Sequence, residues 1–422
     1  MSIDRDARSR RSRRDPPHER HRSAAGAHPR SEARIRRLTA RQEAFLADST
    51  DLETPFLLLD LDVVGERYRA LRAALPGADV YYAVKANPAV QVIDLLARLG
   101  CRFDVASPGE IRRCTEIGVP ASALSYGNTV KRERDVADAA RVGVRRFTVD
   151  AAAELDKVLR HVHDGTVYIR LATDGAGADW PLSRKFGCSE AEAADLAAHA
   201  AAHGLAVGFS FHVGSQQRRP QAWEPPLAAV ARLFDRLVAA GARPGGVNLG
   251  GGLPSAHLDP TPSIDTYGAV IGRLVDRHLG RFMPLPLMVE PGRFLVGDAG
   301  VIQTDVLLVS ARDLDPGRRW VYLDIGLFNG LTETLEEAIR YRVRAPGRHG
   351  PTGPVVLAGP SCDSADVLYE RYEYHLPLDL AIGDRLEILS AGAYTSTYSS
   401  VWFNGFEPLR TYLLAVSGED AA

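Results

Sequence analysis

One lysine in this sequence stands where an amine could take part in chemistry. Lys85 is one of only four lysines among 422 residues, and it directly follows the apolar run at residues 80–84. A strongly hydrated ammonium is unfavourable at the end of a β-rich apolar segment unless it is paired or used chemically. Burial would lower the pKa of Lys85 toward the neutral amine, which can form a Schiff base with a carbonyl compound. The alternative is a lysine that reaches from the strand end into solvent.

Other polar residues also stand at or just after the ends of apolar runs. A single histidine in such a place is typical of a hydrogen-bonded core residue, and a glycine triplet is typical of a turn. Their combination is more informative than any one of them, because several kinds of functional group recur at the same kind of position. The residues concerned are Asp104, Arg170, His212, Gly250, Gly251, Gly252, Glu290 and Arg293.

Together these groups predict one cofactor. Glycine-rich backbone, Ser215 and Arg293 can cradle a phosphate through N–H groups and a guanidinium. A carboxylate such as Glu290 can keep a pyridine nitrogen protonated, and the His212 ring can stack on the pyridine. With an amine at Lys85 added, the set matches the needs of pyridoxal 5′-phosphate (PLP).

Eight strand-like segments precede these polar residues and alternate with helical stretches. We expect the strands near residues 79–84, 101–105, 122–126, 144–149, 166–171, 206–213, 245–249 and 286–290. Repeated strand–helix units of this number favour a (β/α)8 barrel, with a doubly wound sheet as the alternative. Barrel enzymes build their sites at the carboxyl ends of the strands, which is where the polar residues lie.

The chain changes texture after about residue 298. Apolar β-like runs are separated there by Gly, Pro and Asp, and we expect little helix apart from residues 331–342. The sequence therefore predicts a PLP-binding barrel at 62–298 and a mainly antiparallel β domain formed by 41–61 and 299–422.

Residues 1–40 differ in composition from the rest. They contain 12 arginines and 5 acidic residues, a formal charge of +7, so the remaining 382 residues carry −9. We interpret them as a disordered, solvated arm, and contact with nucleic acid is not expected. The four cysteines form no C-x-x-C pair and no apolar run is long enough for a membrane span, so we expect a cytoplasmic protein without a metal site.

Seven motifs resemble those of a known family. YYAVKANP, FDVASPGE, HVGSQ, LGGGLP, EPGRFLV, GPSCDSADVL and GAYTSTYSSVWFNGF occur in the order found in the fold-type III PLP decarboxylases, which act on ornithine, lysine or diaminopimelate. The resemblance runs from about residue 50 to 415. It implies an alanine-racemase-like barrel and a PLP-dependent decarboxylase.

The resemblance assigns roles to individual residues. Lys85 matches the lysine that binds the cofactor covalently, His212 the residue stacked on the ring, and Glu290 the partner of the pyridine nitrogen. Cys362 matches the residue that returns a proton after carbon dioxide leaves, and Asp363 the one that binds the distal ammonium of the substrate. In the family these last two come from the neighbouring subunit, which implies a homodimer. The implied cofactor site also includes Asp104, Arg170, Ser215, Gly250, Gly251, Gly252, Gly292, Arg293 and Tyr394.

Substrate choice rests on the same resemblance. Cys362-Asp363 is similar to the ornithine and lysine class, whereas diaminopimelate enzymes have Cys-Glu. Glu337 is expected to face the distal amine, with Glu336 as the competing candidate, and Phe403 lies in the substrate-side loop.

The extra methylene of Glu337, relative to the aspartate of many relatives, favours L-ornithine, decarboxylated to putrescine, over L-lysine, decarboxylated to cadaverine. The alternatives are a diaminopimelate decarboxylase or an enzyme for a specialised diamino acid. More remote are an amino-acid racemase, which has no need of GPSCDSAD, and a non-catalytic regulator, which would be expected to lose cofactor residues.

Overall fold

The computed structural model describes residues 37–182 and 184–418. Most of the predicted arm at residues 1–40 lies outside the described residues. Its last positions do not belong to such an arm, because Thr39 caps helix α1 (Ala40–Asp48). The Thr39 side chain accepts from the N–H of Gln42, and the Gln42 side chain accepts from the N–H of Thr39, which satisfies two amides at the start of the helix.

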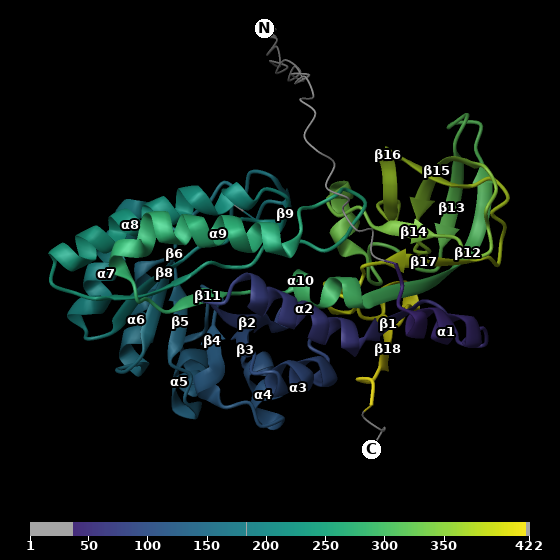
Figure 1. Ribbon diagram of the computed structural model, residues 1–422. Coiled ribbons are helices and arrows are strands. Elements are labelled where there is room, and N and C mark those ends of the chain that lie inside the picture. Colours follow the sequence, from purple (N-terminus) through teal and green to yellow (C-terminus); the bar gives the residue numbers. More distant parts are fainter. Residues whose placement is uncertain (1–36, 183, 419–422) are drawn as a thin grey trace, which may run out of the picture. The chain divides into compact units, whose positions relative to one another are not determined.

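The eight predicted strands are confirmed, and they close into a parallel barrel (Figure 1). The order around the barrel is β10-β11-β2-β3-β4-β5-β6-β8. Their bounds are β2 Asp79–Ala83, β3 Arg102–Val105, β4 Leu124–Tyr126, β5 Arg146–Val149, β6 Thr166–Arg170, β8 Ala206–Ser210, β10 Pro244–Asn248 and β11 Leu287–Val289.

Helices connect the barrel strands and pack their apolar faces on them. In α3, for example, Val92, Ile93, Leu95 and Leu96 are buried, which is the spacing of one helical face. Inside the barrel, Tyr81, Tyr168 and Met288 form a separate buried cluster. The helices are α2 Leu61–Ala74, α3 Val90–Arg98, α4 Pro108–Glu116, α5 Glu133–Val142, α6 Ala152–His161, α7 Glu190–Ala202, α8 Glu224–Ala239, α9 Ile264–Leu279 and the short α10 Arg293–Val296.

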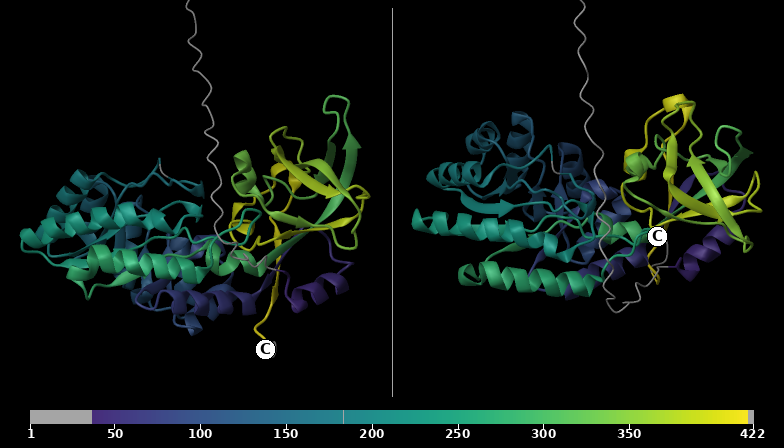
Figure 2. Two further views of the ribbon diagram at one scale, coloured as in Figure 1. Left: turned by 45° about the horizontal axis from the view of Figure 1, so that its top comes forward. Right: turned by 90° about the horizontal axis from the view of Figure 1, so that it is seen from above.

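A second sheet follows the barrel in the sequence, and most of its pairs are antiparallel, as predicted. Its order is β14-β17-β12-β13-β15-β16, and β1 (Phe56–Asp60) joins it by pairing with β12 and β18. Figure 2 shows this sheet, green to yellow apart from the purple β1, and the barrel from two further sides. The exact domain boundaries given above stay a prediction. The remaining strands are β12 Gly300–Ala311, β13 Arg319–Leu323, β14 Arg342–Arg344, β15 Thr352–Ala358, β16 Val367–Pro377, β17 Arg385–Leu389 and β18 Arg410–Leu414, with β7 Ala178–Trp180 and β9 Ser215–Gln217 forming a small separate ladder.

The prediction of a helix at residues 331–342 is wrong. A short 3₁₀ segment, η6 (Thr332–Glu337), occupies the first half, with Leu335 extended and Glu336 and Glu337 in the left-handed region. The Glu337 carboxylate accepts hydrogen bonds from three successive backbone amides at residues 370–372 on β16. These contacts to a distant strand override the local helical pattern.

Among the described residues, no helix is both long enough and apolar enough to cross a membrane.

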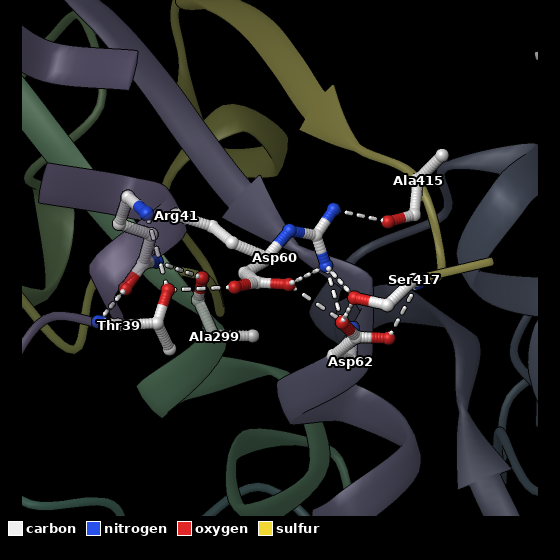
Figure 3. Close-up of polar contacts among 8 residues, drawn as sticks. Thr39, Arg41, Asp60, Asp62, Ala299, Ala415 and Ser417 are labelled. Atoms are coloured by element: carbon white, nitrogen blue, oxygen red, sulfur yellow. Dashed lines mark hydrogen bonds and ion pairs between the residues drawn. The ribbon is translucent and has the colours of Figure 1, made fainter. Parts of the chain in front are cut away.

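Arg41 on α1 ties the two ends of the described chain to the start of α2 (Figure 3). Its guanidinium lies 3.3 Å from the buried Asp60 carboxylate at the end of β1 and also pairs with Asp62. The same side chain donates to Ser417 Oγ at 3.1 Å and to the carbonyl of Ala415. One cation therefore joins α1, the β1–α2 junction and the C-terminal segment.

We predict that Arg41→Ala lowers the free energy of unfolding by about 1 kcal/mol, the upper value for a partly exposed ion-pair network. Asp60 would keep the hydroxyl of Thr39 at 2.7 Å, so the loss should stay moderate. Urea unfolding followed by circular dichroism measures the change. Arg69→Ala, at an exposed position on α2, is the control. Equal midpoints for Arg41→Ala and this control would contradict the prediction.

Candidate active site

Closure of the barrel brings the predicted polar residues to one rim. Lys85 lies in η1 (Val84–Ala86) directly after β2, Asp104 lies within β3, and Arg170 ends β6. His212 comes two residues after β8, and Glu290 directly follows β11. Since the strands are parallel, these carboxyl ends face the same side of the barrel.

Lys85 forms an ion pair with Asp104. The ammonium Nζ lies 2.9 Å from Asp104 Oδ2, and half of the lysine side chain is exposed at the mouth of the barrel while Asp104 is buried. Burial acts to lower the pKa of Lys85, but Asp104, with smaller contributions from Tyr394 and Glu290, raises the pKa above its ordinary value. The sequence-based expectation of a lowered pKa is therefore wrong, because it took no account of the facing acids. In this arrangement Asp104 holds the lysine as an ammonium.

Glu290 is an acid whose charge is poorly stabilised. Burial, followed by the nearby charge of Asp104, raises the pKa of Glu290 to about 7, against the opposing effects of Lys85, Asn248 and Arg170. The Asn248 amide donates to Glu290 Oε1 at 2.5 Å and so fixes the carboxylate. Asn248 ends β10 and was missed by sequence reasoning, although it is a polar residue at the end of a buried strand like the others.

His212 presents a neutral ring to the site. Burial, and then the charges of Arg170 and Lys85, lowers the pKa of His212 to about 3. Its Nδ1 accepts from the N–H of Gly214 at 3.1 Å, which leaves the other ring nitrogen to carry the hydrogen. A side chain at Gly251 would come within 3.0 Å of His212 Nε2 and 2.7 Å of the Glu290 carbonyl, so only glycine fits between them.

The residues expected to bind phosphate also meet. Arg293 is buried, and its Nη2 donates to Ser215 Oγ at 3.0 Å. Its guanidinium carbon lies 5.0 Å from the centre of the Tyr394 ring. At Gly292 an added side chain would collide with the Tyr394 hydroxyl at 2.8 Å. Gly250 and Gly252 both have left-handed backbone, with φ of 68° and 104°.

Other predicted site residues do not join this cluster. Cys362 and Asp363 are exposed, and no described hydrogen bond or ion pair links them to the residues around Lys85. Phe403 packs on Phe328, with ring centres 4.7 Å apart. Glu337 does not join the cluster either, because both of its carboxylate oxygens accept hydrogen bonds from backbone amides of β16.

Comparison with known proteins agrees with this geometry. Residues 61–297 match the family described as pyridoxal-dependent decarboxylase, pyridoxal binding domain. The lysine/ornithine decarboxylase of Selenomonas ruminantium is 36% identical over 373 residues, which cover 88% of this chain and 92% of that protein. The chain belongs to the pyridoxal-dependent decarboxylases.

Solved structures support the same assignment. A crystal structure of SrLDC in complex with PLP and cadaverine has a TM-score of 0.79 and 34% identity, and the match covers 90% of this chain and 95% of that one. The arginine decarboxylase of Paramecium bursaria Chlorella virus has a TM-score of 0.80 and 27% identity, with coverages of 89% and 99%. The protein is thus a PLP-dependent decarboxylase of the basic amino acid group.

The residues of this decarboxylase fit the cofactor. Two nitrogens of the buried Arg293 guanidinium, Nε and Nη1, have no hydrogen-bond partner among the described residues, so they are free to donate to a phosphate. The glycine backbone at the same rim has no room for larger residues, because a side chain at Gly251 or Gly252 would collide with neighbouring carbonyl oxygens. Glu290, His212 and Lys85 lie at the same rim and could meet the ring and its aldehyde.

We predict that Glu290→Gln changes how the stability of the cofactor-free protein depends on pH. The folded pKa of Glu290, about 7, is above the ordinary value of 4.5. Its contribution to stability is therefore fully present below about pH 4.5 and is lost as the pH rises through about 7. Glutamine does not titrate, so the melting temperature of the variant relative to wild type should rise by a few degrees between pH 5 and pH 8. Scanning fluorimetry across this range measures it, and a difference independent of pH would contradict the assignment.

Proposed function

We propose that the protein decarboxylates L-ornithine to putrescine, with L-lysine as a slower substrate that yields cadaverine. We further propose that it acts as a homodimer in which the partner's Cys362 and Asp363 complete each site. The observation that carries this proposal is that Cys362 and Asp363 are exposed, and that no described hydrogen bond or ion pair links them to the residues around Lys85 of the same chain. A cysteine and a carboxylate on the surface can serve a site in a second subunit.

The loop that carries this pair is well ordered by its neighbours. The buried Asp366 accepts from the backbone amides of Leu327 and Ser361, and the Asn404 side chain accepts from the amide of Cys362 at 2.9 Å. Asp363 in turn accepts from the amide of Ala365 at 2.9 Å. These contacts hold the loop in one conformation, which supports the proposal that it presents Cys362 and Asp363 to the site of a second subunit.

The remaining roles follow from the charges and contacts at the rim. When bound, PLP supplies a pyridine ring that accepts the electron pair left as carbon dioxide departs. Lys85 binds the cofactor, and Asp104 holds or takes its proton. Glu290 would keep a proton at the nitrogen of the bound ring, and the neutral His212 side chain would cover the ring and exclude water.

One further set of residues binds the phosphate, and another acts on the substrate. The phosphate is bound by Ser215, Arg293 and the glycine backbone. Across the dimer, Cys362 Sγ returns the proton to the reacting carbon, and Asp363 pairs with the distal ammonium.

The chemistry of Asp363 supports a substrate with a distal ammonium, a group that ornithine and lysine share. An aspartate suits a distal ammonium, whereas a distal carboxylate, as in diaminopimelate, would meet a like charge. The similarity to a lysine/ornithine decarboxylase supports the same substrate class. The extra methylene of Glu337 does not support a choice between ornithine and lysine, because that carboxylate is bound to three backbone amides of β16. The bulky Trp402, which is 65% exposed and precedes Phe403 in the substrate-side loop, is the residue that we propose limits substrate length and so favours ornithine over lysine.

The test is carbon dioxide release from ornithine, lysine, arginine and diaminopimelate. We expect ornithine to have the highest kcat/KM and lysine to be about tenfold to two-hundredfold lower, the usual value of one methylene. Asp363→Ala should reduce both by at least about a hundredfold, since it leaves a desolvated ammonium unpaired. Asp379→Asn, which changes an exposed acid in the turn after β16, is the control. A preference for arginine or diaminopimelate would overturn the proposed substrate.

The shared site is tested by mixing two inactive variants. Lys85→Ala and Cys362→Ala dimers that exchange subunits should regain up to about one quarter of wild-type activity, because half of the dimers are mixed and each has one intact site of two. Each variant alone, taken through the same exchange, is the control. If subunits exchange and no activity returns, each chain completes its own site.

A further inference from the structure

Arg293, one of the residues expected to bind phosphate, forms a buried ion pair with Glu333. Arg293 Nη2 is 2.6 Å from Glu333 Oε1, and only 3% and 6% of the two side chains are exposed. Arg293 begins α10 at the end of the barrel, whereas Glu333 lies in η6 among the strands of the second sheet. Sequence reasoning did not single out Glu333. Removing both charges from water is unfavourable, so the pair calls for a functional explanation.

The guanidinium of Arg293 is held on only part of its surface. Nη2 serves both Glu333 and Ser215, and the flat face lies over the Tyr394 ring. Nε and Nη1 remain without a partner among the described residues. The contact with Glu333 therefore helps to fix the orientation of the group, and the buried Tyr341 hydroxyl lies close enough to interact with it as well.

Among the described residues, the Glu333 side chain has one hydrogen-bond partner, Arg293. Its second oxygen, Oε2, is buried without a hydrogen-bond partner there. The backbone carbonyl of Glu333 accepts from Ile339 at 3.0 Å, which holds the turn. Burial raises the pKa of Glu333 and the Arg293 charge opposes this, while the same carboxylate raises the pKa of Arg293. For Arg293, burial acts to lower the pKa and the Glu333 carboxylate raises it, so the guanidinium stays charged and the two groups attract each other in the buried site.

We propose that Glu333 is a positioning residue that holds the Arg293 guanidinium in place for the phosphate of the cofactor. This inference rests on the proposed role of Arg293 in phosphate binding. It assigns to the segment Thr332–Glu337 a part in cofactor recognition within the same chain. The reach of the carboxylate matters more than its charge, because a nearby negative charge by itself would repel a phosphate.

The test compares PLP with pyridoxal, which lacks the phosphate. Dissociation constants of both are measured by absorbance titration of the cofactor-stripped protein, and their ratio reports recognition of the phosphate. We expect Glu333→Ala to reduce this ratio about tenfold. Glu333→Gln, which keeps the reach of the side chain, should stay within about threefold of wild type, whereas the shorter Glu333→Asp should behave like alanine. The Asp and Gln variants decide the matter if the alanine protein does not fold.

Two controls separate this role from a general loss of structure. Glu387→Ala removes another buried acid of the second sheet, paired with Arg344, and should leave the ratio unchanged. In an Arg293→Met background, Glu333→Ala should have no further effect on the ratio, because the group it positions is gone.

The other outcomes are distinct. Equal weakening of PLP and pyridoxal by Glu333→Ala, or tighter PLP binding, would overturn the role of Glu333. An unchanged ratio in Arg293→Met would instead overturn the role of Arg293 in phosphate binding. Neither result depends on which amino acid the enzyme decarboxylates.

Discussion

Closure of eight parallel strands into one ring is the constraint on which the site depends. Residues as far apart as Lys85 and Glu290 come together only because every strand delivers its carboxyl end to the same rim. The ring leaves little space between neighbouring strand ends. Gly251, for instance, fits between His212 and the Glu290 carbonyl only because it has no side chain. A closed barrel thus fixes both which groups meet and how closely.

The rim then balances a small set of charges. Two cations, Lys85 and Arg170, lie among two acids, Asp104 and Glu290, and of these four residues only Asp104 is fully buried. Asp104 pairs directly with Lys85, and Glu290 is left with the amide of Asn248 as its direct contact. This division explains why the ammonium is stabilised while the second acid titrates near neutral pH. A ring nitrogen that carries a proton is a suitable partner for such a carboxylate.

In the second sheet, too, buried charged groups have partners, and these contacts hold the sheet to the rest of the chain. Strand β1 enters the sheet between β12 and β18, and Arg41 secures its end to the C-terminal segment. In η6, Glu333 and Glu337 are four residues apart, so a regular helix would place both on one face. The break at Leu335 and Glu336 separates them. One acid can then pair with Arg293 while the other binds the amides of β16.

The sequence by itself determined the barrel and most of its rim. Short apolar runs alternate with helical stretches, and the polar residues that follow the runs must share one side of a parallel ring. Tertiary structure alone decided the raised pKa of Lys85, the loss of the helix at 331–342, and the partners Asn248 and Glu333. Each of these depends on a contact between segments distant in the chain, such as Asn248 with Glu290 or Glu337 with Tyr372. Local periodicity records which face of an element is buried, but not which distant charge or amide will lie against it.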